Sequence, residues 1–165
     1  MLIIDAFAFC RNSEQQTGKL KLSELARLRA ECVSDDGEVE WTLVGNTHTI
    51  GYPSLQLTVT GTVQLVCQRC LTPYVFQISS DAKMLLAKDE QAADELDTSL
   101  EDDGIEVIVG SKAFDIIALI EDEALLAIPL SPKHEVCPSK EKLDAFATAK
   151  KVSPFAALKD QLSKN

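Results

Sequence analysis

The sequence lacks several features that mark nucleotide-binding and hydrolytic enzymes. Glycine occurs only 7 times in 165 residues, and no group of glycines has the spacing of a phosphate-binding loop. There are 2 histidines, and His48 stands between two threonines with no carboxylate at a fixed local spacing. A Ser-His-Asp set therefore cannot be assembled from the sequence pattern. These absences argue against P-loop nucleotide chemistry and triad hydrolysis.

The chain also lacks the marks of a secreted or membrane protein. It has an odd number of cysteines, 5, and no secretory signal, which argues against a disulfide framework. The apolar start is interrupted by Asp5, and its first basic residue, Arg11, follows the apolar stretch. No apolar run is long enough to span a bilayer. We therefore expect a cytoplasmic protein without a membrane partner.

Basic residues are scarce in the middle of the chain. The formal net charge is -10, and residues 84–132 carry thirteen acidic side chains against two basic ones. Such a surface repels a phosphate backbone at long range. Direct nucleic-acid binding would need a local basic patch, whereas the acidic middle suits basic protein partners.

What is present predicts a single α+β domain over residues 1–165. Residues 55–66 alternate strictly between apolar and polar, and the alternation resumes at 74–78, which indicates a long antiparallel hairpin. Gly61 within the first stretch suggests a bulge or bend. Helical spacing at 24–32 and 114–128 predicts helices packed on the sheet. We expect an acidic, mobile loop at 88–104 and a helical tail at 139–165.

The most distinctive feature is the pair Cys67 and Cys70, spaced as Cys-Gln-Arg-Cys. In a thioredoxin-like redox site the first cysteine opens a helix, which lowers its pKa. Here strands are predicted on both sides, so a redox site is disfavoured. In a zinc knuckle, two thiolates converge from a hairpin turn and supply half of a tetrahedral site. The predicted hairpin fits that arrangement.

The other half of a zinc site would come from His134 and Cys137, an i, i+3 pair in a proline-flanked loop that includes Pro132. A set of three cysteines and one histidine suits zinc chemically. About sixty residues separate the two pairs, and nothing in the sequence forces them together. The alternative, which the sequence favours, is that the cysteines are buried thiols and His134 is a loop residue.

Three consecutive acids, Glu121, Asp122 and Glu123, lie in the helix predicted at 114–128. Helical geometry directs Glu121 and Asp122 differently, so we interpret them as a solvated helix face rather than a carboxylate site. Glu123 falls within the apolar stripe. It is expected to pair with a cation such as Arg69.

Taken in order, several motifs resemble the YceD-like family of large ribosomal RNA subunit accumulation proteins. The resemblance covers nearly the whole chain. It rests on segments 66–71, 120–129 and 153–158, together with Pro132, His134 and Cys137. Its motif residues are Cys67, Arg69, Cys70, Glu121, Asp122, Glu123, Pro132, His134, Cys137, Pro154 and Phe155.

This resemblance implies a non-enzymatic role in the synthesis, processing or stability of large-subunit (23S) ribosomal RNA. The partners would be the ribosomal RNA precursor, ribosomal proteins or a processing nuclease, and no oligomeric state is favoured. Contacts to RNA would use basic residues, namely Arg69, Lys133, Lys140, Lys142, Lys150 and Lys151. A thiol redox protein and a structural zinc-knuckle interaction module stay open as alternatives.

Overall fold

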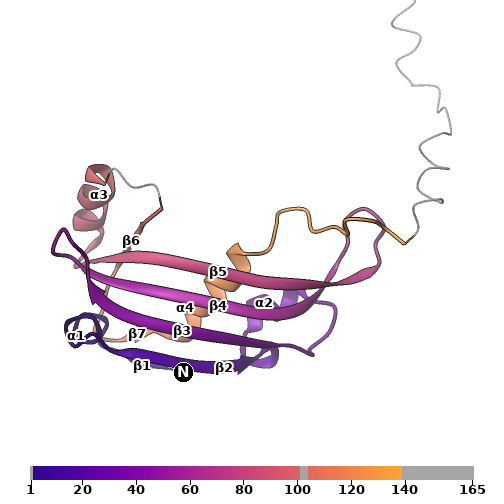
Figure 1. Ribbon diagram of the computed structural model, residues 1–165, viewed down its shortest axis with the longest axis horizontal. Helices are drawn as coiled ribbons and strands as arrows, with labels where there is room; N and C mark the ends of the chain where they lie inside the picture. Colours follow the sequence, from indigo (N-terminus) through magenta and orange to yellow (C-terminus); the bar gives the residue numbers. More distant parts are fainter. Residues whose placement is uncertain (1, 101–103, 139–165) are drawn as a thin grey trace, which may run out of the picture.

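The computed structural model describes residues 2–100 and 104–138. Five strands form the main sheet in the order β2-β3-β4-β5-β6, and β1 pairs with β7 in a separate two-stranded sheet (Figure 1). The strands are β1 (Ile3–Ile4), β2 (Gln15–Lys21), β3 (Glu38–Thr47), β4 (Pro53–Val66), β5 (Pro73–Ala87), β6 (Glu106–Val109) and β7 (Phe114–Asp115). The α-helices are α1 (Ala6–Arg11), α2 (Ala26–Glu31), α3 (Glu90–Ser99) and α4 (Ile116–Leu126), with a 3-10 turn at Leu22–Glu24.

The predicted α+β class and the long hairpin are confirmed. Strands β4 and β5 pair antiparallel from Ser54 opposite Leu85 to Val66 opposite Pro73. The sheet is antiparallel except at its edge, where β6 runs parallel to β5. That exception follows from the connection, because β5 and β6 are joined through α3 rather than by a tight turn.

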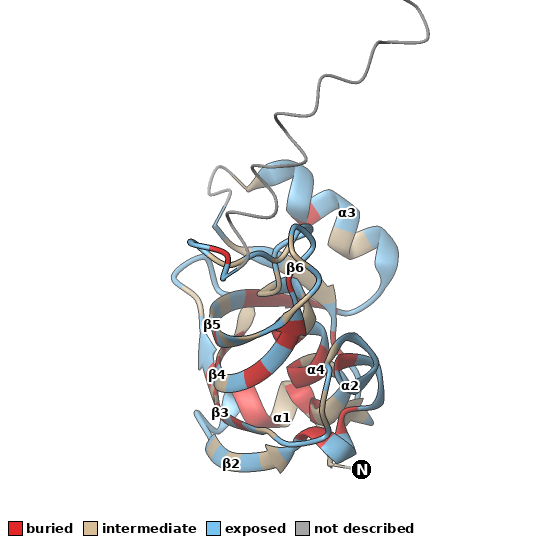
Figure 2. Cartoon of the chain, turned by 90° about the vertical axis from the view of Figure 1, so that its right-hand side faces the viewer, coloured by how far each residue is buried: buried red, intermediate tan, exposed pale blue. Residues whose placement is uncertain are grey.

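One face of the sheet is apolar and covered by helices. Alternating residues of β3 and β4, such as Trp41, Leu43, Leu57 and Val59, are buried, and the residues between them face outwards. Helices α1, α2 and α4 lie on this face, and the strands curl around them (Figure 2). Helix α4 crosses beneath β4 and β5. The segment that follows it runs to the turn between these two strands (Figure 1).

The bulge expected at Gly61 is absent. Gly61 pairs in register with Val39 of β3 and Ile78 of β5. A β-carbon at this position would lie 2.8 Å from the carbonyl oxygen of Glu38. Glycine is therefore explained by the close approach of the neighbouring backbone rather than by a bend.

The loop expected at 88–104 is also corrected. Residues Glu90–Ser99 form helix α3, which begins where the Asp89 carboxylate accepts a hydrogen bond from the Ala92 N–H at 2.8 Å. Leu96 is buried and anchors the helix near the β5–β6 edge. The helical tail expected at 139–165 lies outside the described residues. None of the described helices has the length and apolar character needed to cross a membrane.

Candidate functional site

The turn between β4 and β5 presents two thiols on a compact loop. The last strand pair is Val66 with Pro73, and the Cys67 N–H closes the loop by donating to the Thr72 carbonyl at 3.0 Å. Within it, the Leu71 N–H donates to the Cys67 carbonyl at 2.8 Å. Leu71 has a φ of 59°, in the left-handed region. These bonds form the tight connection that the sequence predicted for the Cys-Gln-Arg-Cys segment.

The proline-flanked segment after α4 lies against this turn. The Gln68 N–H donates to the Pro132 carbonyl at 2.8 Å, and the rings of Tyr74 and His134 stand 4.9 Å apart. In Figure 1 the segment leaves α4, rises past the edge of β5 and reaches the hairpin tip. The two halves that are distant in sequence are thus adjacent in space.

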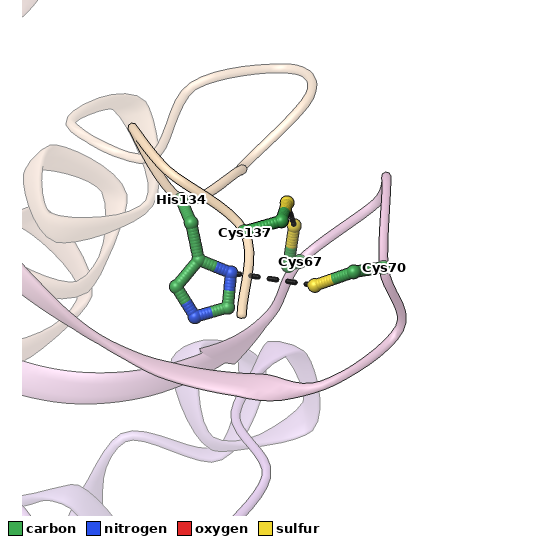
Figure 3. Close-up of side chains that lie close together, drawn as sticks. All are labelled: Cys67, Cys70, His134 and Cys137. Carbon is green, nitrogen blue, oxygen red and sulfur yellow. Dashed lines mark hydrogen bonds between the residues drawn. The ribbon is translucent and has the colours of Figure 1, made fainter. Parts of the chain in front are cut away.

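Four metal-ligating side chains converge at this junction. The ligand atoms of Cys67, Cys70, His134 and Cys137 all lie within 4.8 Å of one another. The sulfur atoms of Cys67 and Cys137 are 3.8 Å apart, and the Cys70 sulfur lies 3.4 Å from His134 Nδ1 (Figure 3). Cys67 and Cys137 are buried, whereas Cys70 and His134 are half-buried. All four residues were predicted as possible ligands from the sequence, but their convergence could not be predicted from it.

Arg69 lies within the site and donates hydrogen bonds to the segment that follows α4. Its Nε donates to the Cys137 sulfur at 2.9 Å, and its Nη2 donates to the His134 carbonyl at 2.9 Å. The expected pairing of Arg69 with Glu123 is wrong, because the guanidinium is engaged by Cys137 and the loop carbonyls. Lys133 is exposed beside the site, while Lys140, Lys142, Lys150, Lys151, Pro154 and Phe155 lie outside the described residues.

The environment favours a thiolate on the first cysteine. Burial alone would raise the pKa of Cys67, but hydrogen bonds from the backbone of Cys70, His134 and Arg69 outweigh it and lower this pKa to about 5. The Thr72 hydroxyl, 3.1 Å away, lowers the pKa of Cys70. A hydrogen bond to Cys67 raises the pKa of His134. Burial raises the pKa of the Cys137 thiol.

Comparison with known proteins gives one family. The family model for large ribosomal RNA subunit accumulation protein YceD matches residues 55–161, which is more than half of the chain. The chain belongs to the YceD family. The match includes both halves of the cysteine and histidine cluster and confirms the resemblance predicted from the sequence. No solved structure matches this YceD-family chain.

The solvated helix face expected for two acids of this YceD-family chain is correct for Asp122, which is exposed, and wrong for Glu121. Glu121 is buried, and its Oε1 accepts hydrogen bonds from the N–H groups of Arg27 at 2.6 Å and Leu28 at 3.2 Å. Its Oε2 accepts from Arg27 Nε at 2.8 Å. Helix α2 has no side-chain cap from its own N-cap residue, Leu25, so the carboxylate of α4 supplies that cap.

The other two acids also tie α4 to its neighbours. Arg27 Nη1 donates to Asp122 Oδ1 at 2.5 Å, so one arginine bridges both carboxylates. The Ser80 hydroxyl of β5 donates to Glu123 Oε2 at 2.8 Å, and burial raises the pKa of Glu123. Sequence reasoning missed Arg27, because no local spacing connects it to a motif more than ninety residues away. Through these contacts the three acids of α4, Glu121, Asp122 and Glu123 (the acidic triad), hold α2, α4 and β5 together.

Three sulfurs and one imidazole can either bind a metal or undergo thiol chemistry. Cys67 and Cys70 lie in a hairpin turn, and within residues 2–100 and 104–138 no helix begins at either of them. The helix dipole that activates thioredoxin-like cysteines is therefore lacking in this turn. The convergence of ligands from two loops favours coordination over redox catalysis.

Proposed function

We propose that this protein is a non-enzymatic binding factor in the synthesis, processing or stability of large-subunit (23S) ribosomal RNA, acting in the cytoplasm. The YceD family match over residues 55–161 carries the proposal. The name of the family refers to accumulation of large-subunit ribosomal RNA, and a factor that binds an assembling particle can support such accumulation without catalysing a reaction.

The acidic charge supports recognition through proteins in addition to RNA. With a net charge of -10, the chain as a whole attracts basic ribosomal proteins and repels bare phosphate. RNA contacts would concentrate on lysines, namely the exposed Lys133 and the tail residues Lys140, Lys142, Lys150 and Lys151. Arg69 is a poorer contact than the sequence suggested, since it donates to Cys137 and the His134 carbonyl.

Co-sedimentation with large-subunit precursors tests this function. The tagged full chain is expected to travel with precursor particles at low salt and to dissociate as salt rises, because the contacts are electrostatic. Cells depleted of the protein are expected to lose mature large-subunit RNA relative to small-subunit RNA. A chain that sediments only at the top of the gradient at low salt, with RNA ratios unchanged on depletion, would refute the proposal.

The same experiment separates the charged contacts. A Lys133→Glu variant reverses the charge of an exposed side chain beside the hairpin, and it is expected to weaken association without changing stability. Lys112→Glu is the matched control, because Lys112 is exposed and lies two residues after Gly110, which bonds to Ala87 at the end of β5 away from the turn; it is expected to leave association intact. Equal losses in both variants would place the contact surface elsewhere.

A further inference from the structure

We propose that Cys67, Cys70, His134 and Cys137 bind one zinc ion that fastens the segment after α4 to the β4–β5 turn. The proposal does not depend on the ribosomal function. Two ligands come from the hairpin and two from a loop more than sixty residues later in the chain. Within the described ranges these four are the cluster of His, Cys, Asp and Glu side chains placed to hold a metal.

The separations between the ligand atoms fit a tetrahedral zinc site. Zinc–sulfur bonds of about 2.3 Å give tetrahedral sulfur–sulfur edges of about 3.8 Å, and a zinc–nitrogen bond of about 2.0 Å gives sulfur–nitrogen edges of about 3.5 Å. The Cys67–Cys137 sulfur separation is 3.8 Å, and the Cys70 sulfur is 3.4 Å from His134 Nδ1. Figure 3 shows these side chains directed at one another from opposite loops. The widest separation, 4.8 Å, closes with a movement of about 1 Å.

The donor set selects the metal. Three thiolates and an imidazole are soft to borderline ligands, which favour zinc over magnesium or calcium. Four protein ligands fill a tetrahedral shell and leave no position for a reacting water, so the ion is structural rather than catalytic. Hydrogen bonds from the Cys67 and Leu71 N–H groups already fix the backbone of the β4–β5 turn. Metal binding therefore costs little conformational entropy at Cys67 and Cys70.

Arg69 balances the excess negative charge of this site. Three thiolates outweigh one divalent ion by a single negative charge, and a partly buried excess charge is costly without a counter-ion. The Arg69 guanidinium supplies the opposite charge at 2.9 Å from the Cys137 sulfur. Hydrogen bonds to a coordinated sulfur orient the ligand as well as neutralise it. Arg69 is therefore a positioning residue for Cys137.

Elemental analysis of the full chain purified without chelator is the direct test. We expect about one zinc per chain in the wild type and a loss of most of it in Cys70→Ser and in Cys137→Ser. The control is Cys32→Ser, which removes a half-buried thiol that donates to the Leu28 carbonyl outside the cluster. Retention of zinc by Cys32→Ser is expected. Equal loss in Cys32→Ser, or a wild type that holds only traces of metal after zinc is supplied, would overturn the proposal.

Cobalt substitution tests the site in the wild-type chain, so the result does not depend on whether a cysteine variant folds. Wild-type chain loaded with Co²⁺ alone is expected to show the intense visible bands of a tetrahedral ion and a thiolate charge-transfer band in the near ultraviolet. Cys70→His retains a ligand and is expected to keep the tetrahedral bands while weakening the charge-transfer band. Weak octahedral bands in the wild type, or a disulfide between Cys67 and Cys137 by mass spectrometry of the freshly purified chain, would refute the site.

Discussion

At the scale of single residues, Leu71 occupies a backbone conformation that suits glycine. Its φ is 59°, and its side chain is 73% exposed, so the leucine buries little in return for the strain. A left-handed conformation costs an L-residue roughly 1–2 kcal/mol, and glycine is free of this cost. The position is set by the turn, because the Leu71 N–H must reach the Cys67 carbonyl.

Replacing Leu71 with glycine is therefore expected to stabilise the protein. The free energy of unfolding should rise by about 0.5–1 kcal/mol, since relief of the left-handed strain exceeds the added entropy of the unfolded chain. Urea denaturation measures the change. Leu130→Gly is the control, because Leu130 is also exposed but has a negative φ, and it should give no gain. A loss of stability in Leu71→Gly would contradict this account.

Glu123 provides a prediction on pH dependence. Burial raises its pKa above the ordinary value of 4.5; the Ser80 hydrogen bond opposes the shift, and Glu106 and Asp122 reinforce it. The folded state thus binds the proton more tightly than the unfolded state. Its contribution to stability is present below the unfolded pKa and is lost as pH rises through the folded pKa.

Glu123→Gln mimics the protonated acid and can still accept from the Ser80 hydroxyl. At about pH 8 the variant is expected to be more stable than the wild type, and the advantage should shrink towards about pH 5 as the acid takes up its proton. Urea denaturation at both pH values checks this. An advantage that stayed constant with pH would show that Glu123 does not titrate between them.

At the scale of elements, the strands and helices that were predicted correctly from the sequence are those with a clear hydrophobic periodicity of their own. The strand predicted at 55–66 is β4, which begins two residues earlier (Pro53–Val66), because alternation reports a half-buried strand directly. The periodicity at 114–128 gave α4. Helix α3 was missed because its residues are mostly polar, and its formation depends on the Asp89 cap and the docking of Leu96.

The candidate site was predictable in its parts and not in its assembly. The spacing of Cys67 with Cys70, and of His134 with Cys137, is visible in the sequence. Their meeting depends on the direction in which α4 leaves the sheet, and that direction is set by packing. The same limit explains the wrong partner assigned to Arg69 and the solvated face assigned to Glu121, because both depend on contacts between distant elements.

The cap that α4 provides to α2 is expected to be worth more than an ordinary surface ion pair. Glu121→Ala leaves the N–H groups of Arg27 and Leu28 without their acceptor, and we expect a loss of about 2–3 kcal/mol in the free energy of unfolding. Asp122→Asn removes only the negative charge of the exposed contact to Arg27 and should cost at most about 1 kcal/mol. Urea denaturation of the two variants makes the comparison. Equal losses would show that Glu121 acts merely as a surface charge.

At the scale of the whole molecule, two junctions fix α4 and the segment that follows it. The first is the acidic triad, which joins the helix to α2 and β5 through hydrogen bonds. The second is the cysteine and histidine cluster, which joins the following segment to the hairpin tip. The large apolar core lies around the first junction, and the second lies at the far end of the hairpin (Figure 1).

Removing metal is therefore expected to loosen one end of the molecule without unfolding it. After chelation, hydrogen exchange should accelerate at the Gln68 amide, which donates to Pro132, and at Leu71. The Arg27 and Leu28 amides held by Glu121 should keep their protection, because their acceptor lies in the core and not at the metal. Adding back zinc should restore the slow exchange at Gln68. Global loss of protection on chelation would mean that the metal holds the whole fold, and unchanged exchange at the tip would mean that the bond to Pro132 needs no metal.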